Sequence, residues 1–338
     1  MAFDDIIEIN GQKMTKGYIE GLSHPERELL IEPIFQYFRK LGFSYPDRLD
    51  KVKDSYKKII EYQPNLELDE LYNNSNHGTN ICKYFCKSFY DASDKGGRTM
   101  KEVFSDDTSL KKLIRNRLGL CWNDGANESF NLSPKMMIQG MRSMRLVSVL
   151  TLFKPEIAKY VYMKYSNEGD LCYDYSSGFG ARMLGCVSAG RRYLGVDPLT
   201  VPELEVMAQT LGLKDYMLMQ RCSEDFKTPP NIFDLAFSSP PYNNLEIYSK
   251  DDTQAYNKGE KYFFETYWAE TLKNIKNSLK ARKYFILNVK EDRMLKMAKM
   301  EFEYKEKIGL KTVRSHLNKT GKDDAIKYEY IYVFINNK

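Results

Sequence analysis

The sequence is poor in several residue types that mark particular classes of protein. Its 338 residues include 3 histidines, 2 tryptophans and 6 cysteines. The cysteines are scattered, which is not the spacing of a disulfide framework. No stretch approaches the ~18 consecutive apolar residues that a membrane-spanning helix needs, and the N-terminal segment MAFDDIIEIN is acidic. We therefore exclude membrane and secreted classes and expect a protein of the reducing cytoplasm.

Potential metal ligands are equally sparse. His77, Cys82 and Cys86 come nearest to a zinc pattern, but they contain no C-x-x-C pair, and the next cysteine is Cys121. Zinc sites in proteins usually show closely paired ligands. We therefore expect no metal site.

Net charge gives a weak indication of the partner. The formal net charge is +5, but residues 1–130 hold 19 Lys and Arg against 21 Asp and Glu, and the remaining residues hold 32 against 25. A polyanionic partner is therefore expected to meet the second part of the chain. A slightly basic, solvated surface explains the same excess equally well.

The arrangement of apolar residues divides the chain near residue 130. Helical spacing at 24–42, 48–62 and 110–118 predicts a mainly helical region over residues 1–129. After Pro134, a long amphipathic segment is followed by alternating strands and helices, with strands expected at 171–174, 193–196, 216–220, 234–237, 284–289 and 328–334. This alternation predicts an α/β domain over residues 130–338, with a mostly parallel sheet covered on both faces.

The segment Asp174–Gly180, with the sequence DYSSGFG, follows the first of these strands and opens a helix. Glycines at such a turn allow a sharp bend and the close approach of a ligand. The next strand ends at Asp197, 23 positions after Asp174, where a carboxylate can accept hydrogen bonds from ribose hydroxyls. Turn glycines occur in many α/β proteins, so this pattern has limited specificity.

A third carboxylate, Asp225, follows the third strand and could hydrogen-bond an adenine amino group. Ligands of open α/β sheets bind at the carboxyl ends of the strands, so these three aspartates could line one crevice. Met183 occupies the position of the third glycine of a G-x-G-x-x-G motif. This departure favours an adenosine-bearing cofactor without a pyrophosphate over NAD.

The most informative stretch is Asp234–Tyr242, with the sequence DLAFSSPPY. An apolar strand runs into a Pro-Pro turn, which fixes the backbone and removes two amide donors. The carbonyl groups there can accept hydrogen bonds from a substrate amino group, and Tyr242 offers an aromatic face for a planar base. The alternative is a strand terminus with a buried tyrosine.

These two motifs resemble those of the amino-methyltransferases that use S-adenosylmethionine. In that family an Asp/Asn/Ser-Pro-Pro-aromatic signature follows a D-x-F-x-G-x-G turn, and the resemblance covers roughly residues 130–338. Ser239–Tyr242 matches the catalytic signature in full. The turn has Tyr175 and Ser176 where Pro and Phe are usual. The segment Phe130–Pro134 resembles the one that lies against the methionine part of the cofactor.

The resemblance implies a Rossmann-like, doubly wound methyltransferase sheet with S-adenosylmethionine as cofactor. It assigns cofactor contacts to Asp174, Ser176, Gly178, Gly180, Asp197, Asp225 and Pro134. It assigns catalysis to Ser239, Pro240, Pro241 and Tyr242. A base rotated out of double-stranded DNA would place its amino group against Ser239 and the Pro240 carbonyl, with Tyr242 stacked on its ring.

Within this resemblance, N4 of cytosine is favoured over N6 of adenine, because serine before Pro-Pro is commoner in the cytosine enzymes. No Pro-Cys dipeptide is present, which disfavours methylation at cytosine C5. An RNA amino-methyltransferase, acting for example on guanine N2, is the main alternative, and a catalytically silent cofactor- or DNA-binding subunit is another.

Target recognition has no readable motif. We expect it in the N-terminal helices together with the segment 243–268, which is rich in tyrosine and charge. Dimerisation or binding of a partner, such as a specificity subunit, is the alternative role for the N-terminal region, and its net negative charge counts against direct contact with DNA.

Overall fold

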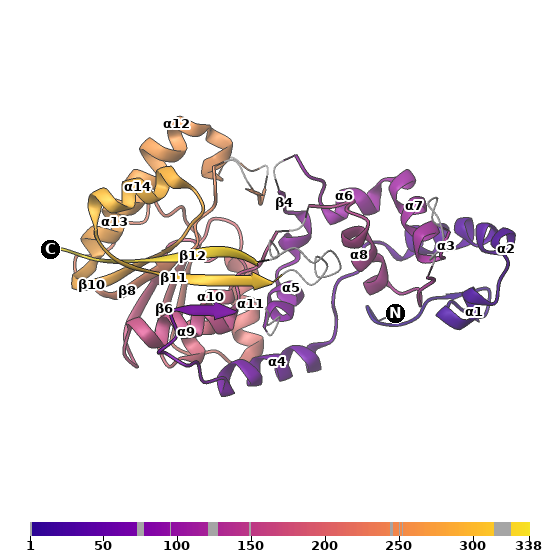
Figure 1. The fold of residues 1–338 in the computed structure, drawn as a ribbon, viewed down its shortest axis with the longest axis horizontal. Coiled ribbons are helices and arrows are strands. Elements are labelled where there is room, and N and C mark those ends of the chain that lie inside the picture. Colours follow the sequence, from indigo (N-terminus) through magenta and orange to yellow (C-terminus); the bar gives the residue numbers. More distant parts are fainter. Residues whose placement is uncertain are drawn as a thin grey trace. The chain divides into compact units, whose positions relative to one another are not determined.

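The computed structural model describes residues 2–72, 78–94, 96–120, 128–148, 150–243, 246–249, 251, 253–313 and 326–338. These residues form two compact units, each assembled from separate segments (Figure 1). One unit comprises Met1–Leu49, Lys87–Leu150 and Glu246–Ser249, and the other comprises Asp50–Cys86, Thr151–Leu245 and Lys250–Lys338. No single position therefore separates the units. The assignment of recognition to residues 1–129 and of catalysis to residues 130–338 stays a prediction.

The first unit is mainly helical. Its elements are β1 (Glu8–Ile9), β2 (Gln12–Lys13), α1 (Lys16–Glu20), α2 (His24–Leu29), α3 (Ile31–Leu41), η1 (Lys87–Asp91), β4 (Ser93–Asp94), α6 (Met100–Ser105), α7 (Asp107–Arg117), α8 (Pro134–Ser143) and β9 (Glu246–Ile247). Local sequence explains several boundaries. Ser23 and Glu26 form a capping box at α2, and Thr99 and Glu102 form another at α6. In place of the single helix expected over 24–42, the structure has two helices, α2 and α3, separated at Leu30.

The second unit contains the central sheet. Its elements are α4 (Leu49–Glu61), β3 (Glu70–Tyr72), α5 (Thr79–Phe85), α9 (Pro155–Tyr165), β5 (Leu171–Asp174), α10 (Ala181–Ser188), β6 (Arg192–Val196), α11 (Val201–Leu211), β7 (Tyr216–Met219), β8 (Phe233–Ser238), η2 (Ala255–Lys258), α12 (Glu260–Tyr262), η3 (Phe263–Trp268), α13 (Ala269–Ser278), β10 (Leu279–Asn288), α14 (Asp292–Glu301), β11 (Glu303–Val313) and β12 (Ile326–Ile335).

The 8-stranded sheet has the order β3-β11-β12-β10-β8-β5-β6-β7. Strands β7, β6, β5, β8 and β10 are parallel, whereas β12 lies antiparallel between β10 and β11. The chain crosses from β5 toward β7 on one side and toward β10 on the other, which creates a topological switch point between β5 and β8. The predicted fold class, an α/β Rossmann-like doubly wound sheet with a mainly helical N-terminal region, is confirmed.

Helices cover both faces of this sheet, as the alternation of side chains along β8 shows. The ring of Phe237 meets Tyr162 of α9 at a centroid distance of 5.4 Å. Its neighbour Ala236 belongs to the apolar cluster on the opposite face, to which α13 and α14 contribute. Adjacent residues of a strand point to opposite faces, so an all-buried strand requires cover on each side.

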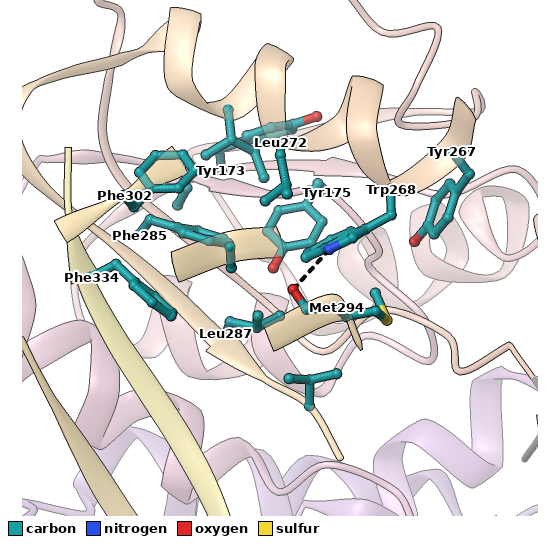
Figure 2. Packing of buried hydrophobic residues seen from close by; sticks show 14 of the residues in the cluster. Tyr173, Tyr175, Tyr267, Trp268, Leu272, Phe285, Leu287, Met294, Phe302 and Phe334 are labelled. Atoms are coloured by element: carbon teal, nitrogen blue, oxygen red, sulfur yellow. Dashed lines mark hydrogen bonds between the residues drawn. The ribbon is translucent and has the colours of Figure 1, made fainter. Parts of the chain in front are cut away.

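That cluster is rich in aromatic side chains (Figure 2). Tyr173 and Phe233 stack at 4.6 Å with an interplanar angle of 11°, and the indole of Trp268 donates a hydrogen bond of 3.0 Å to the carbonyl of Met294. The indole N–H, a donor that would be costly to bury unpaired, is thus satisfied by the helix that covers it. The segment 262–268 supplies much of this buried core.

No helix among the described residues is long and apolar enough to cross a membrane.

Candidate functional site

The carboxylate of Asp174, the last residue of β5, is fully buried and hydrogen-bonded on both oxygens. Its Oδ2 accepts from Arg182 Nε at 2.9 Å and from the hydroxyl of Tyr193 at 2.8 Å. Its Oδ1 accepts from the hydroxyl of Ser238 at 2.7 Å and from the backbone N–H of Ser176 at 3.2 Å. These partners come from β6, α10, β8 and the turn itself. Asp174 therefore positions the turn rather than presenting a free carboxylate to a ligand.

The two glycines of the turn serve different purposes. Both have left-handed backbone angles, with φ of 54° at Gly178 and 83° at Gly180. A Cβ atom at Gly180 would lie 2.6 Å from Leu204 of α11, whereas a Cβ atom at Gly178 would meet nothing closer than 3.9 Å. Gly180 thus permits tight packing of the turn on the protein, and Gly178 leaves an open side that a ligand can approach.

Asp197, which follows β6, is half-buried and binds three backbone amides. Its Oδ2 accepts from Gly178 N–H at 2.9 Å, and its Oδ1 accepts from the N–H groups of Leu199 and Thr200, each at 2.9 Å. Burial raises the pKa of this carboxyl, although the three amides oppose the shift. Asp197 therefore joins the turn to the start of α11. A contact with ribose stays a prediction that must use the lone pairs left over.

After β7, the structure buries Glu224 and exposes its neighbour Asp225. Glu224 is 4% exposed and accepts a hydrogen bond of 3.1 Å from the hydroxyl of Tyr262. Burial raises the pKa of Glu224. The adenine contact expected of Asp225 stays a prediction. The sequence did not single out Glu224, because it does not show which of two adjacent carboxylates in a polar turn becomes buried.

Cys222, Glu224 and Asp225 present potential ligand atoms within 4.8 Å of one another. Burial raises the pKa of the Cys222 thiol to about 11, so the protonated form prevails at neutral pH. Acidic side chains often lie this close together at a protein surface without holding an ion, so we do not assign this cluster as a metal site. His77 and Cys121 lie outside the described residues.

The Ser-Pro-Pro-Tyr loop leaves the sheet at the end of β8, beside the turn that follows β5. The hydroxyl of Ser239 donates to Oδ1 of Asn288 at 3.1 Å, and Nδ2 of Asn288 donates to the carbonyl of Tyr330 at 3.1 Å. The second bond fixes which way the amide points, so Oδ1 faces Ser239. The serine oxygen then keeps its lone pairs for another donor. Sequence inspection missed Asn288 because it ends a strand 49 residues further along the chain.

Tyr242 is 7% exposed and belongs to the apolar cluster. Pro240 is also buried, and Pro241 is half-buried. Stacking of Tyr242 on a base stays a prediction, and it requires that more of the ring become accessible than the structure exposes. The rigid turn expected between the strand and this ring stays a prediction that rests on the two consecutive prolines.

Pro134 belongs to the other compact unit, where it is the first residue of α8 after the N-cap Ser133. It lines a small apolar pocket together with Phe38, Met137 and Met141. The remaining predicted site residues all belong to the unit that contains the sheet. The contact of Pro134 with a cofactor stays a prediction.

Tyr267 was not predicted as a site residue. It lies in the π-helical turn Phe263–Trp268, at the margin of the cluster in Figure 2, and π-helical turns are frequent at functional sites. Its buried hydroxyl has no hydrogen-bond partner among the described residues, although Ser176 and Ser223 lie near enough to influence its pKa. Burial raises that pKa, so the hydroxyl stays protonated and available as a donor.

The sequence matches no protein-family model, and it matches no curated protein. Among solved structures, part of the chain is similar to the tRNA (m1A58) methyltransferase TrmI from Aquifex aeolicus, at 12% identity over 56% of this chain and 71% of that chain, with a TM-score of 0.38. It is similar to TrmN from Thermus thermophilus at 14% identity over 54% and 48% of the two chains, with a TM-score of 0.38.

A SAM-dependent O-methyltransferase from Thermotoga maritima gives a further partial match, at 11% identity over 62% of this chain and 73% of that chain, again with a TM-score of 0.38. Identities this low describe the fold alone, and the TM-scores are too low to indicate an activity. The fold class rests on the strand order and direction described above.

Proposed function

We propose that this protein transfers the methyl group of S-adenosylmethionine to the exocyclic amino group of a base flipped out of DNA, with N4 of cytosine favoured over N6 of adenine. One observation carries the proposal. The Ser-Pro-Pro-Tyr loop begins at the carboxyl end of β8, and the hydrogen bond of 2.7 Å from Ser238 to Asp174 ties that end to the glycine turn after β5. The segments to which we assign cofactor binding and catalysis are thus neighbours at the switch point of the sheet, where ligands of such sheets bind.

The residues around the turn fit an adenosine-bearing cofactor. Gly178 leaves open space beside the backbone, Asp197 is half-buried at the end of β6, and the unpartnered hydroxyl of Tyr267 offers a donor. When bound, S-adenosylmethionine supplies an electrophilic methyl group on a positively charged sulfur. In the proposal, the turn and Asp197 hold the adenosine part.

The chemical difficulty lies in the target amino group, whose lone pair is delocalised into the base. Acceptors that draw its N–H groups toward tetrahedral geometry make that lone pair available. Because the hydroxyl hydrogen of Ser239 is directed to Asn288, the serine oxygen can accept from the amino group, as can the carbonyl of Pro240. After transfer, the methylated nitrogen is positively charged, and it loses a proton to water.

A methyl-transfer assay tests this proposal. The protein is incubated with radiolabelled S-adenosylmethionine and either duplex DNA or total RNA, and the nucleic acid is digested to nucleosides. Label in N4-methylcytosine or N6-methyladenine of DNA is the expected result. Label confined to RNA, or none in either, overturns the proposal.

A further inference from the structure

The strands β11 and β12 extend past the carboxyl edge of the parallel sheet. The last pair between β10 and β12 joins Asn288 to Ile331, yet β12 starts five residues earlier at Ile326. That extension pairs with β11 through Lys311 and Tyr328. Because β12 is antiparallel to β10, residues 326–330 lie beyond the edge at which Asn288 and Ser239 meet. The two long strands are yellow in Figure 1.

Aromatic and basic side chains alternate on one face of this extension. Lys311 of β11 pairs laterally with Tyr72 of β3 and with Tyr328 of β12, so the three form a row across the sheet. Next to this row, Tyr330 of β12 pairs with Gly309 of β11. Lys307 lies two residues before Gly309 on β11. Alternate residues of a strand share a face. We call Tyr72, Lys307, Lys311, Tyr328 and Tyr330 the tyrosine–lysine face.

The rings and ammonium groups of this face lie in contact. Lys307 Nζ lies 4.1 Å from the ring centre of Tyr330, and Lys311 Nζ lies 5.4 Å from that of Tyr72 and 6.0 Å from that of Tyr328. The rings of Tyr328 and Tyr330 are nearly parallel, at 11°. Tyr72 is 62% exposed and Tyr328 is 41% exposed. One carboxylate shares the face: Glu70 pairs with Gly309, two residues from Tyr72, and interacts electrostatically with Lys311.

Protection of the outer edge of the sheet, near β3 and β11, would account for Lys307 and Lys311 but not for the exposed tyrosines beside them. Lysine on an edge strand prevents further strand pairing. That purpose requires no exposed tyrosines, and exposed rings such as those of Tyr72 and Tyr328 enlarge the apolar surface. Positive charge interleaved with exposed aromatic rings is instead the combination by which proteins bind unpaired nucleic acid, with rings stacking on bases and lysines facing phosphates.

We propose that the tyrosine–lysine face binds a single-stranded segment of DNA next to the target base, an inference that rests on the proposed function. The carbonyl of Tyr330 accepts the hydrogen bond from Asn288 that orients Ser239. Hydrogen bonds therefore connect Tyr330 of the face to the candidate catalytic serine through a single residue, Asn288. A strand opened for base flipping exposes neighbouring bases, which this face can hold by stacking.

The experiment measures binding of a fluorescein-labelled single-stranded oligodeoxynucleotide by fluorescence anisotropy, without cofactor. Tyr328→Ala is expected to weaken binding by roughly 5- to 100-fold, as the loss of one stacked base does. The double variant Lys307→Ala/Lys311→Ala is expected to flatten the dependence of log affinity on log salt by about 0.7 for each lysine–phosphate interaction that it removes. The controls are Tyr62→Ala and Lys214→Ala, two surface positions outside the face.

Affinity of all variants within twofold of the wild type overturns this inference, as does binding of single-stranded RNA at least tenfold tighter than DNA. Circular dichroism confirms that each variant is folded, which removes unfolding as a cause of weak binding. Because the assay contains no cofactor, the two proposals fail separately. Binding through the face without methylation of DNA overturns only the proposed function, whereas methylation of DNA that the face variants leave unchanged overturns only this inference.

Discussion

The hydroxyl of Ser238 donates a hydrogen bond of 2.7 Å to Oδ1 of Asp174. These are the last residues of two adjacent parallel strands, β8 and β5. The bond therefore fixes the distance between the Ser-Pro-Pro-Tyr loop and the glycine turn. If the loop binds the target and the turn binds the cofactor, the approach of the methyl group to the amino nitrogen depends on this link.

Asp174→Asn should destabilise the protein severely. The substitution removes the carboxylate that neutralises the buried guanidinium of Arg182, and breaking a buried ion pair costs about 3–5 kcal/mol. Urea unfolding followed by circular dichroism measures the effect. Asp225→Asn, at an exposed carboxylate of the same unit, should change the free energy of unfolding by less than about 0.5 kcal/mol. Equal effects of the two substitutions would contradict the role given to Asp174.

Gly178→Ala should reduce the affinity for S-adenosylmethionine, because the added methyl group occupies the open side of the turn. The left-handed backbone, with φ of 54°, adds a strain of about 1 kcal/mol. Gly212→Ala is the matched control, since Gly212 has φ of 66°, no atom within 4 Å of an added methyl group, and a place at the end of α11. Isothermal titration calorimetry should show weaker binding for the first variant alone. Equal affinity of the two variants would mean that the cofactor does not approach Gly178.

Gly178 and Gly180 show which features of the site could be predicted from the sequence and which could not. The order of strand, turn and helix predicted that the glycine turn and Asp197 lie close together, because the carboxyl ends of parallel strands share one edge of a sheet. Hydrogen bonds in the structure join Gly178 to Asp197. The sequence could not distinguish a glycine required for packing from one that leaves space, because Leu204 belongs to α11, which comes only after the next strand, β6.

Other parts of the fold lacked a local signal. Strand β11, with the sequence EYKEKIGLKTV, has charged residues on both faces of its first half, so it lacks the apolar alternation typical of a strand. Strand β3 has three residues and pairs with a partner more than 230 positions away. Asn288 and Tyr267 were likewise missed, since each reaches the site through pairing or packing with distant elements.

Tyr267→Phe should lower the affinity for S-adenosylmethionine without destabilising the protein. The buried hydroxyl has no partner in the described residues, and an unsatisfied buried group is unfavourable, so its removal should leave the free energy of unfolding unchanged or higher. Loss of a hydrogen bond to the cofactor corresponds to a weakening of roughly 2- to 10-fold. In the control, Tyr216→Phe removes a hydroxyl bonded to Glu205 at the amino end of β7, and cofactor affinity should not change. A destabilised Tyr267→Phe variant with normal affinity would contradict the proposed contact.

Glu224→Gln should stabilise the protein increasingly as the pH rises. Burial raises the pKa of Glu224 in the folded protein, so between the unfolded and folded pKa values the folded state binds more protons. The free energy of unfolding of the wild type therefore falls as the pH increases through that window. Glutamine does not titrate and can still accept from Tyr262. The advantage of the variant should grow as the pH rises above the ordinary pKa of a glutamate, about 4.3, and should level off once the pH exceeds the raised pKa of the folded protein.

Chemical unfolding at several pH values measures this advantage. Glu265→Gln, at an exposed position of the neighbouring helix turn, is the matched control variant. A stability difference between Glu224→Gln and the wild type that stays constant with pH would contradict the raised pKa of Glu224.

Asn288→Ala should slow methyl transfer by roughly 10- to 100-fold, a size typical of misplaced reacting groups. Without the amide, the hydroxyl of Ser239 loses the acceptor that orients it. Asn288 is a positioning residue, so kcat should fall while the affinity for S-adenosylmethionine is retained. Initial rates with DNA and calorimetry with the cofactor separate the two. A variant with full kcat would contradict the orientation of Ser239 by Asn288.

The central claim is that the loop after β8 presents an exocyclic amino group of DNA to the cofactor. Its most direct test is the identity of the methylated nucleoside, determined by mass spectrometry after incubation of duplex DNA with isotopically labelled S-adenosylmethionine. Ser239→Ala is compared with Ser105→Ala, at an exposed serine of α6. We predict labelled N4-methylcytosine from the wild type and from Ser105→Ala, and at least about tenfold less from Ser239→Ala. Unlabelled DNA from the wild type, or equal labelling by both variants, would contradict the account.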